Sequence, residues 1–193
     1  MKKLYFFIVI GWLFTVMSCK HQCPPFDKGV LSWIPYQEND VVELYSESSD
    51  LIIKFSIKSV VVSHQTQYQD YAKCGTCDDY IEITQNSSDN FVFYAGMSLH
   101  KNKKISQNYF MGDTPFYTYS EFKKYQFNGN EYDKVRVFES TNLNKTFKTL
   151  ITVKGIGIIG LIDNEDHVWV LKNDKIKESK EGNGIIIHET SCG

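Results

Sequence analysis

The feature that most constrains the fold is a succession of short apolar or alternating segments separated by polar turns. Such segments, a few residues long and rich in Val, Ile, Phe and Tyr, are typical of strands. No part of the chain keeps an apolar stripe at helical spacing, and Ser120–Tyr125 is expected to form one helical turn at most. The predicted strands are Val30–Pro35, Val41–Tyr45, Leu51–Ser63, Tyr80–Thr84, Phe91–Leu99, Ile105–Met111, Phe116–Phe127, Tyr132–Glu139, Thr146–Ile162, Val168–Lys172 and Ile185–Glu189.

The connections between these segments favour antiparallel pairing. Asn128-Gly129 is the clearest hairpin signal, because both residues readily adopt positive φ. Numerous strands joined by short polar turns, without intervening helices, predict an all-β fold. We therefore expect a single antiparallel domain of roughly ten strands over residues 23–193, as a sandwich, a barrel or a half-open barrel.

The N-terminus predicts export. Lys2 and Lys3 precede an apolar run from Leu4 to Met17, which is shorter than the roughly 20 residues of a membrane-spanning helix. The following Val16-Met17-Ser18-Cys19 resembles a bacterial lipobox. The resemblance implies a signal peptide over residues 1–18, a lipid on Cys19 that binds the membrane, and a tether over residues 19–22. Lys20 is not the aspartate associated with inner-membrane retention in enteric bacteria, so we expect an outer-membrane location.

Charge and cysteine content fit an exported domain. The formal net charge of -2 argues against a nucleic-acid partner. In an oxidising compartment the four cysteines other than Cys19 are expected to pair. Three connectivities are open, and we favour Cys74–Cys77 together with Cys23–Cys192, because the second bridge would close nearly the whole domain.

A wider resemblance is carried by several structural motifs. These are Trp33-Ile34-Pro35-Tyr36, Asn39-Asp40-Val41, Cys74 with Cys77, Asn128-Gly129 with Tyr132 and Val135, Lys154-Gly155-Ile156-Gly157, and Trp169-Val170-Leu171. In these motifs the chain resembles small uncharacterised β-rich lipoproteins of Bacteroidota. The resemblance implies an exported β-rich lipoprotein and brings no catalytic residues with it.

Two motifs have a functional and a structural interpretation. Gly155-Ile156-Gly157-Ile158-Ile159-Gly160 matches the dinucleotide-binding pattern, but no helix is expected after the glycines. A strand with a glycine-permitted bend or bulge is the favoured interpretation, so no cofactor is expected. Cys74 and Cys77 are expected to form a structural disulfide, whereas a redox pair or a zinc module with His64 as the nearest further ligand is the alternative.

The histidines and acidic residues do not form a recognisable site. His21, His64, His100, His167 and His188 are scattered, and no hydrolase motif surrounds them. A small envelope hydrolase with a site assembled from separate strands stays an alternative. Asp163–His167 gathers oxygen ligands, but the positions of a calcium loop are not matched, so a hairpin turn is favoured and no metal is expected.

Aromatic residues are the remaining binding candidates. Phe116, Tyr117 and Tyr119 lie in one predicted strand, whose alternation turns aromatic side chains to both faces. An exposed aromatic ring stacks on sugars or lines a lipid pocket. The sequence thus predicts a lipid-anchored, non-catalytic envelope module that binds a hydrophobic ligand or an envelope protein, or has a structural role.

Overall fold

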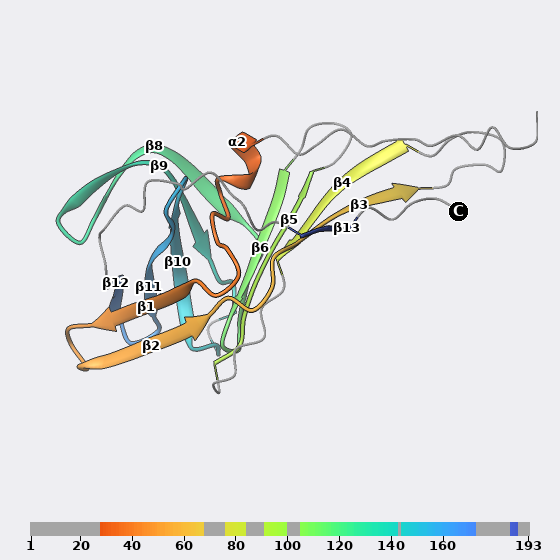
Figure 1. Cartoon of the computed structure of the whole chain (residues 1–193). Helices are drawn as coiled ribbons and strands as arrows, with labels where there is room; N and C mark the ends of the chain where they lie inside the picture. Colours follow the sequence, from red (N-terminus) through yellow and green to blue (C-terminus); the bar gives the residue numbers. More distant parts are fainter. Residues whose placement is uncertain are drawn as a thin grey trace, which may run out of the picture.

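The structure is a computed structural model in which residues 28–67, 76–83, 91–99, 105–142, 144–172 and 186–188 are described. These residues form an all-β fold, as predicted, apart from the short helix α2 (Lys28–Leu31). None of the described helices is long and apolar enough to span a membrane. The strands lie in two separate sheets (Figure 1).

The first sheet, sheet A, has seven antiparallel strands in the order β2-β1-β12-β11-β10-β9-β8. Their bounds are β1 (Val41–Ser46), β2 (Leu51–Ser56), β8 (Tyr119–Phe127), β9 (Asn130–Glu139), β10 (Phe147–Val153), β11 (Gly157–Asp163) and β12 (Val168–Leu171). The predicted hairpin at Asn128-Gly129 is confirmed, because Phe127 pairs with Asn130 and the two turn residues have φ of 46° and 76°. Two positive φ values are typical of a type I′ turn.

The second sheet, sheet B, has six strands in the order β13-β3-β4-β5-β6-β7. Their bounds are β3 (Val61–Gln67), β4 (Thr76–Ile83), β5 (Phe93–Leu99), β6 (Ile105–Met111), β7 (Thr114–Phe116) and β13 (Ile186–His188). All neighbours are antiparallel except β13 and β3, which are parallel. The chain passes from sheet A to sheet B after β2 and returns after β7.

The main core lies between the two sheets and is filled by aromatic side chains. Phe55 of β2 stacks on Phe93 of β5 with ring centroids 4.5 Å apart. Tyr109 of β6 meets Phe138 of β9 edge to face at 5.1 Å. All four residues are fully buried. Because each pair joins the two sheets across a shared core, the described residues form a sandwich.

A second apolar cluster lies on the opposite face of sheet A, under the β8–β9 hairpin. Lys134 interrupts β9 with φ of 56°, so the outer half of the hairpin changes direction. The ring of Phe127, at the tip, then packs over Gly160 of β11. The buried members of this cluster are Phe127, Val135, Val137, Ile151, Val153 and Ile159.

One predicted strand is wrong in type, and a helical turn that the sequence left open inside another predicted strand does not form. Val30–Pro35 is not a strand: it begins in helix α2 and continues into a turn, in which Trp33 N donates to Val30 O. Val30, Trp33 and Ile34 are buried, a spacing of i, i+3 and i+4 that suits a helical face. Ser120–Tyr125, predicted as a possible helical turn, lies in β8, where pairing with β9 keeps it extended.

Candidate functional site

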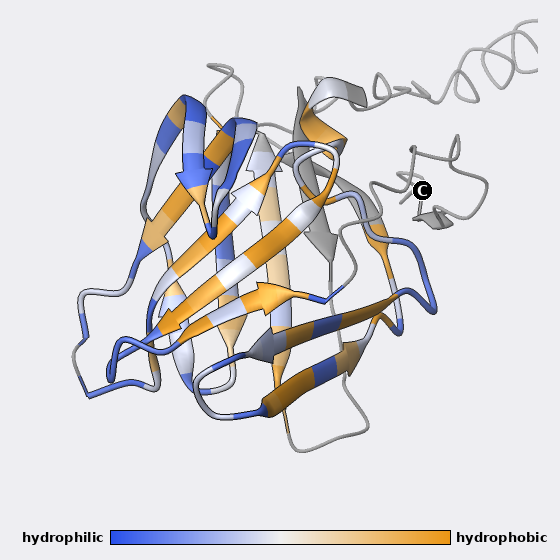
Figure 2. Cartoon of the chain, turned by 90° about the vertical axis from the view of Figure 1, so that its left-hand side faces the viewer, coloured by the Kyte–Doolittle hydropathy of each residue, from blue (hydrophilic) through white to orange (hydrophobic). Residues whose placement is uncertain are grey.

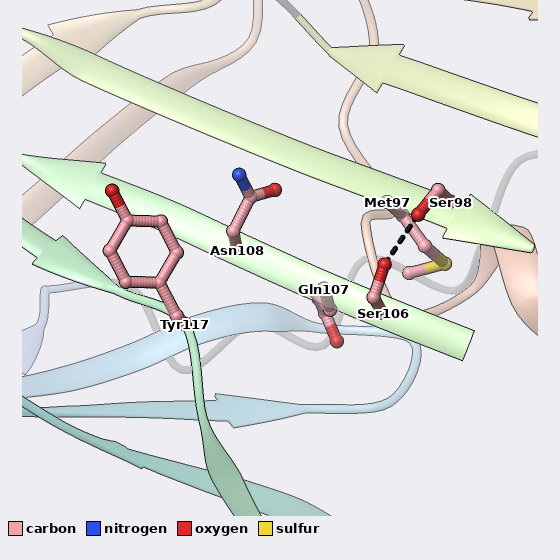
Figure 3. A pocket seen from close by; sticks show the side chains of 6 residues that line it. All are labelled: Met97, Ser98, Ser106, Gln107, Asn108 and Tyr117. Atoms are coloured by element: carbon pink, nitrogen blue, oxygen red, sulfur yellow. Dashed lines mark hydrogen bonds between the residues drawn. The ribbon is translucent and has the colours of Figure 1, made fainter. Parts of the chain in front are cut away.

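The candidate site is a half-open pocket of about 280 Å³ at the edge of sheet B (Figure 3). Strand β7 pairs only with residues 109–111 of β6, so the first half of β6 lies beyond its end. The pocket forms there, next to the segment by which the chain returns to sheet A. Its lining residues come from β5, β6 and that segment, and they are Met97, Ser98, Ser106, Gln107, Asn108 and Tyr117.

The pocket lining carries no charged side chain and combines polar groups with Met97 and one aromatic ring. Ser98 and Ser106 pair across β5 and β6, and their hydroxyl groups are hydrogen-bonded to each other. Figure 3 shows Asn108 farther along β6, between this pair and Tyr117. Tyr117 is 60 % exposed, so its ring is accessible to a ligand. The pocket therefore offers amide and hydroxyl groups beside an exposed aromatic face.

Gln107 connects the pocket to a buried polar cluster inside the sandwich. Its Oε1 accepts a hydrogen bond from Arg136 Nη1 at 2.5 Å, and its Nε2 donates to Tyr109 Oη at 2.7 Å. Nε2 also lies 3.5 Å from the carbonyl oxygen of Trp33. Both ends of this carboxamide thus have partners inside the sandwich, so the Gln107 side chain faces the core, while its neighbours Ser106 and Asn108 lie on the other face of β6.

Arg136, the only arginine of the chain, organises this cluster. It is 3 % exposed, and its guanidinium lies 3.8 Å from the ring centroid of Trp33 and 4.4 Å from that of Tyr119. Its Nε donates to Glu121 Oε2 at 3.1 Å. The charge is thus held between two aromatic faces and one carboxylate, an arrangement that compensates for its removal from water.

Two buried tyrosines support the same region. Burial raises the pKa of Tyr109 well above its ordinary value, and the nearby Arg136 charge opposes this rise only in part. Burial likewise raises the pKa of Tyr36, although its hydroxyl oxygen accepts a hydrogen bond from Ile158 N at 2.7 Å. Both phenols therefore stay neutral over the physiological range and serve as hydrogen-bonding groups within the core.

The three predicted ligand-facing aromatics have different environments. Phe116 was expected to face a ligand. It is instead fully buried in the core and presents no surface to an external ligand. The strand ends at Phe116 and the next one begins at Tyr119, so uniform alternation does not hold across Tyr117. Tyr117 lines the pocket, whereas Tyr119 is half-buried over Arg136.

The acidic segment at Asp163 is a hairpin turn, as predicted, and joins β11 to β12. Asp163 Oδ1 accepts from the backbone N–H of Glu165 and of His167, both at 2.9 Å. Its Oδ2 lies 3.0 Å from His167 Nδ1 and 3.4 Å from Trp169 Nε1. Burial alone would raise the pKa of Asp163, but these hydrogen bonds outweigh it and hold the pKa below its usual value.

This turn places a carboxylate beside a histidine, which are two of the groups that a hydrolase site combines. The side-chain partners that the structure gives His167 are the carboxylates of Asp163 and Glu165. A nucleophilic mechanism also needs a hydroxyl or thiol within reach of the ring. Within the described ranges, no group of three His, Cys, Asp or Glu side chains is placed to hold a metal ion.

The glycine motif forms the turn between β10 and β11 and the start of β11, and the next element along the chain is strand β12. Gly155 and Gly157 have φ of 86° and 91°. The register between β10 and β11 shifts at Ile158–Gly160, so the predicted bend or bulge is confirmed. Thr146–Ile162 is consequently two strands and not one.

Several predicted site residues lie outside the described residues. They are Cys19 with the signal peptide and tether, Cys23, Cys74, Cys192, His21 and His100. Cys77 lies on β4 opposite Thr66 of β3, and His64 lies opposite Asp79. His188 lies on β13. The disulfides, the zinc alternative and the lipidation therefore stay predictions.

Comparison with protein-family models, with curated proteins and with solved structures finds no match to this chain. The site must accordingly be judged on its own chemistry. Gln107, Asn108 and Arg136 were not singled out from the sequence. One signal was present for Arg136: a lone arginine within the apolar stretch Val135–Phe138, where alternation puts it on the same face as Phe138.

Proposed function

We propose that this protein is a lipid-anchored, non-catalytic binding module of the bacterial cell envelope, which takes a neutral polar ligand in the Tyr117 pocket. The observation that carries the ligand proposal is the exposed Tyr117 ring beside the Asn108 amide and the Ser98–Ser106 hydroxyl groups. An aromatic face next to amide and hydroxyl groups suits a sugar ring, which has apolar C–H faces and hydroxyl groups around its edge.

The electrostatics of the pocket favour a neutral ligand over an anionic one. The lining residues carry no charge, and Arg136, which contacts Gln107 from the core side, is already bonded to Gln107 and Glu121. The volume of about 280 Å³ is close to the lower end of small-molecule sites, roughly 300 Å³. We therefore expect one or two sugar-sized units to be recognised.

The close packing of the core favours a polar ligand over a lipid, which the sequence analysis kept as a possible ligand. A lipid-binding fold needs a continuous apolar groove between or within its sheets. Here the space between the sheets holds closely packed aromatic side chains, including the Phe55–Phe93 and Tyr109–Phe138 pairs. The envelope location itself rests on the resemblance of Val16–Cys19 to a lipobox.

Replacing Tyr117 with alanine is expected to weaken ligand binding about tenfold while leaving the fold intact, because the ring supplies stacking and is mostly exposed. A glycan array would first identify a neutral saccharide that binds the full-length protein in a detergent without a sugar headgroup. Titration calorimetry with that saccharide would then compare the variants. Phe122→Ala is the matched control, since Phe122 is also exposed but lies outside the pocket lining. Equal affinity of Tyr117→Ala and the parent would refute the site.

Replacing Cys19 with serine is expected to abolish lipidation, because the lipid is joined to the protein through the cysteine sulfur. Labelling with a palmitate analogue, followed by membrane fractionation, would then find an unlabelled precursor or a soluble protein. Cys23→Ser, four residues farther along the chain, should keep the label and the membrane location. A Cys19→Ser protein that is still processed and labelled would show that the lipobox assignment is wrong.

A further inference from the structure

Gly96 of β5 makes room for the side chain of Asn108 in the pocket. The two residues pair across β5 and β6, and alternation places both on the outer face of sheet B, together with Tyr94. A Cβ added to Gly96 would overlap the Asn108 side-chain oxygen and would lie 2.9 Å from Tyr94 Oη. The Asn108 amide therefore lies across β5, in the space that any other residue at position 96 would fill.

A row of aromatic rings holds Tyr117 beside this amide. Phe110, two residues after Asn108 on β6, meets Tyr94 and Tyr117 edge to face, with ring centroids 5.9 and 5.8 Å apart. Tyr94 and Phe110 are half-buried, so they support the Tyr117 ring while it stays mostly exposed. Figure 3 shows Asn108 and Tyr117 on the same side of β6. The amide and the exposed ring thus face one ligand position.

The outer faces of the two sheets differ in what they offer a ligand. In sheet A the β8–β9 hairpin is mostly hydrophilic, and its exposed side chains include charged ones (Figure 2). In sheet B the residues next to Asn108 on the outer face of β5 and β6 are a glycine and two serines. A neutral polar ligand therefore meets no competing charge at this part of β5 and β6.

The Asn108 amide presents one acceptor and one donor side by side, because its oxygen accepts and its nitrogen donates. None of the hydrogen bonds within the part of the chain that the structure describes uses this amide, so both groups can bind a ligand. Two adjacent hydroxyl groups match it, since one donates to the oxygen while the other accepts from the nitrogen. An acetamido group does not match, because its N–H and C=O point in opposite directions, and an anionic group only accepts.

We propose that Asn108 determines the specificity of the Tyr117 pocket by binding two adjacent hydroxyl groups of a neutral sugar, and that Gly96 positions its amide. This inference rests on the proposed sugar site. The hydroxyl groups of a sugar stand around the edge of its ring, so a ring stacked on Tyr117 turns this edge toward Asn108. A sugar without two adjacent free hydroxyl groups would make the stacking contact alone.

Periodate treatment of a glycan array tests the chemistry of the ligand. Periodate cleaves the carbon–carbon bond between two adjacent hydroxyl groups, which yields two aldehydes while periodate is reduced to iodate. Neutral glycans that bind the full-length protein, in a detergent without a sugar headgroup, should lose binding after this treatment. Binding that survives complete cleavage, or stronger binding of acidic glycans, would overturn the inference. An untreated array on which no neutral glycan binds would refute the sugar site itself, and this inference with it.

A double-mutant cycle tests the two residues, with the neutral glycan that binds most tightly on that array. Asn108→Ala should raise its dissociation constant about tenfold in titration calorimetry, because hydrogen bonds to the sugar are lost. Asn108→Asp keeps the shape but replaces the donor by an acceptor, so it should weaken binding as well. Gly96→Ala should have a similar effect by displacing the amide, and the combined Gly96→Ala and Asn108→Ala variant should bind no more weakly than Asn108→Ala alone.

Stability and affinity together separate positioning from a general effect on the fold. The atoms that a Cβ at Gly96 would meet belong to side chains, so Gly96→Ala should unfold at nearly the same urea concentration as the parent. Parent affinity in Asn108→Ala, or a loss from Gly96→Ala that is undiminished when Asn108 is already alanine, would overturn the inference. Neither result depends on Tyr117→Ala, which tests the sugar site separately.

Discussion

Replacing Arg136 with methionine is expected to lower the free energy of unfolding by about 3 kcal/mol. The change leaves Gln107 Oε1 without the donor that it has at 2.5 Å, and an unpaired buried acceptor costs about 1–3 kcal/mol. It also removes a guanidinium that lies between the rings of Trp33 and Tyr119, a contact worth roughly 1–2 kcal/mol when desolvated. Relief of the buried charge offsets part of this loss. Urea unfolding followed by tryptophan fluorescence measures the difference.

Two further variants separate the contributions. Glu121→Gln should change stability by less than about 1 kcal/mol, since that carboxylate is 55 % exposed and its ion pair is screened by water. Arg136→Met combined with Gln107→Leu should recover part of the loss, because the unpaired acceptor is then gone. If Glu121→Gln is as damaging as Arg136→Met, the surface ion pair and not the buried cluster stabilises the sandwich.

The all-β fold could be predicted from the sequence because alternation and turn residues agree over most of the chain. In the β8–β9 hairpin both signals coincide, at Asn128-Gly129 and in the flanking strands. Alternation is a local property, however, and it does not say where a chain leaves one sheet for another. Leu51–Ser63 and Phe116–Phe127 each appear as one long segment, yet each is divided between sheet A and sheet B.

The pocket depends on one of these crossings and could not be predicted for that reason. Because the chain leaves sheet B after Phe116, Tyr117 is brought beside Asn108 and stays exposed. Within an unbroken strand, Tyr117 and Tyr119 would share one face. The environment of Arg136 has the same origin, since Gln107 of sheet B and Arg136 of sheet A meet only when the two sheets pack together.

Replacing Gly157 with alanine is expected to lower the free energy of unfolding by about 4 kcal/mol. Its φ of 91° disfavours any other residue, which accounts for about 1 kcal/mol. A Cβ at this position would also lie 2.4 Å from the hydroxyl oxygen of Tyr36. Tyr36 is buried and accepts the Ile158 N–H, so it cannot move aside without losing that hydrogen bond and its packing against Phe93.

Gly155 is a matched control, because it has a φ of 86° and lies in the same turn. A Cβ at Gly155 meets no atom within 4 Å, so Gly155→Ala should cost only the conformational term of about 1 kcal/mol. The difference between the two variants in urea unfolding therefore isolates the contact with Tyr36. Equal losses would mean that backbone conformation alone selects both glycines. A larger loss at Gly157 would mean that this glycine of the dinucleotide-like motif is needed because the buried Tyr36 leaves no room for a side chain there.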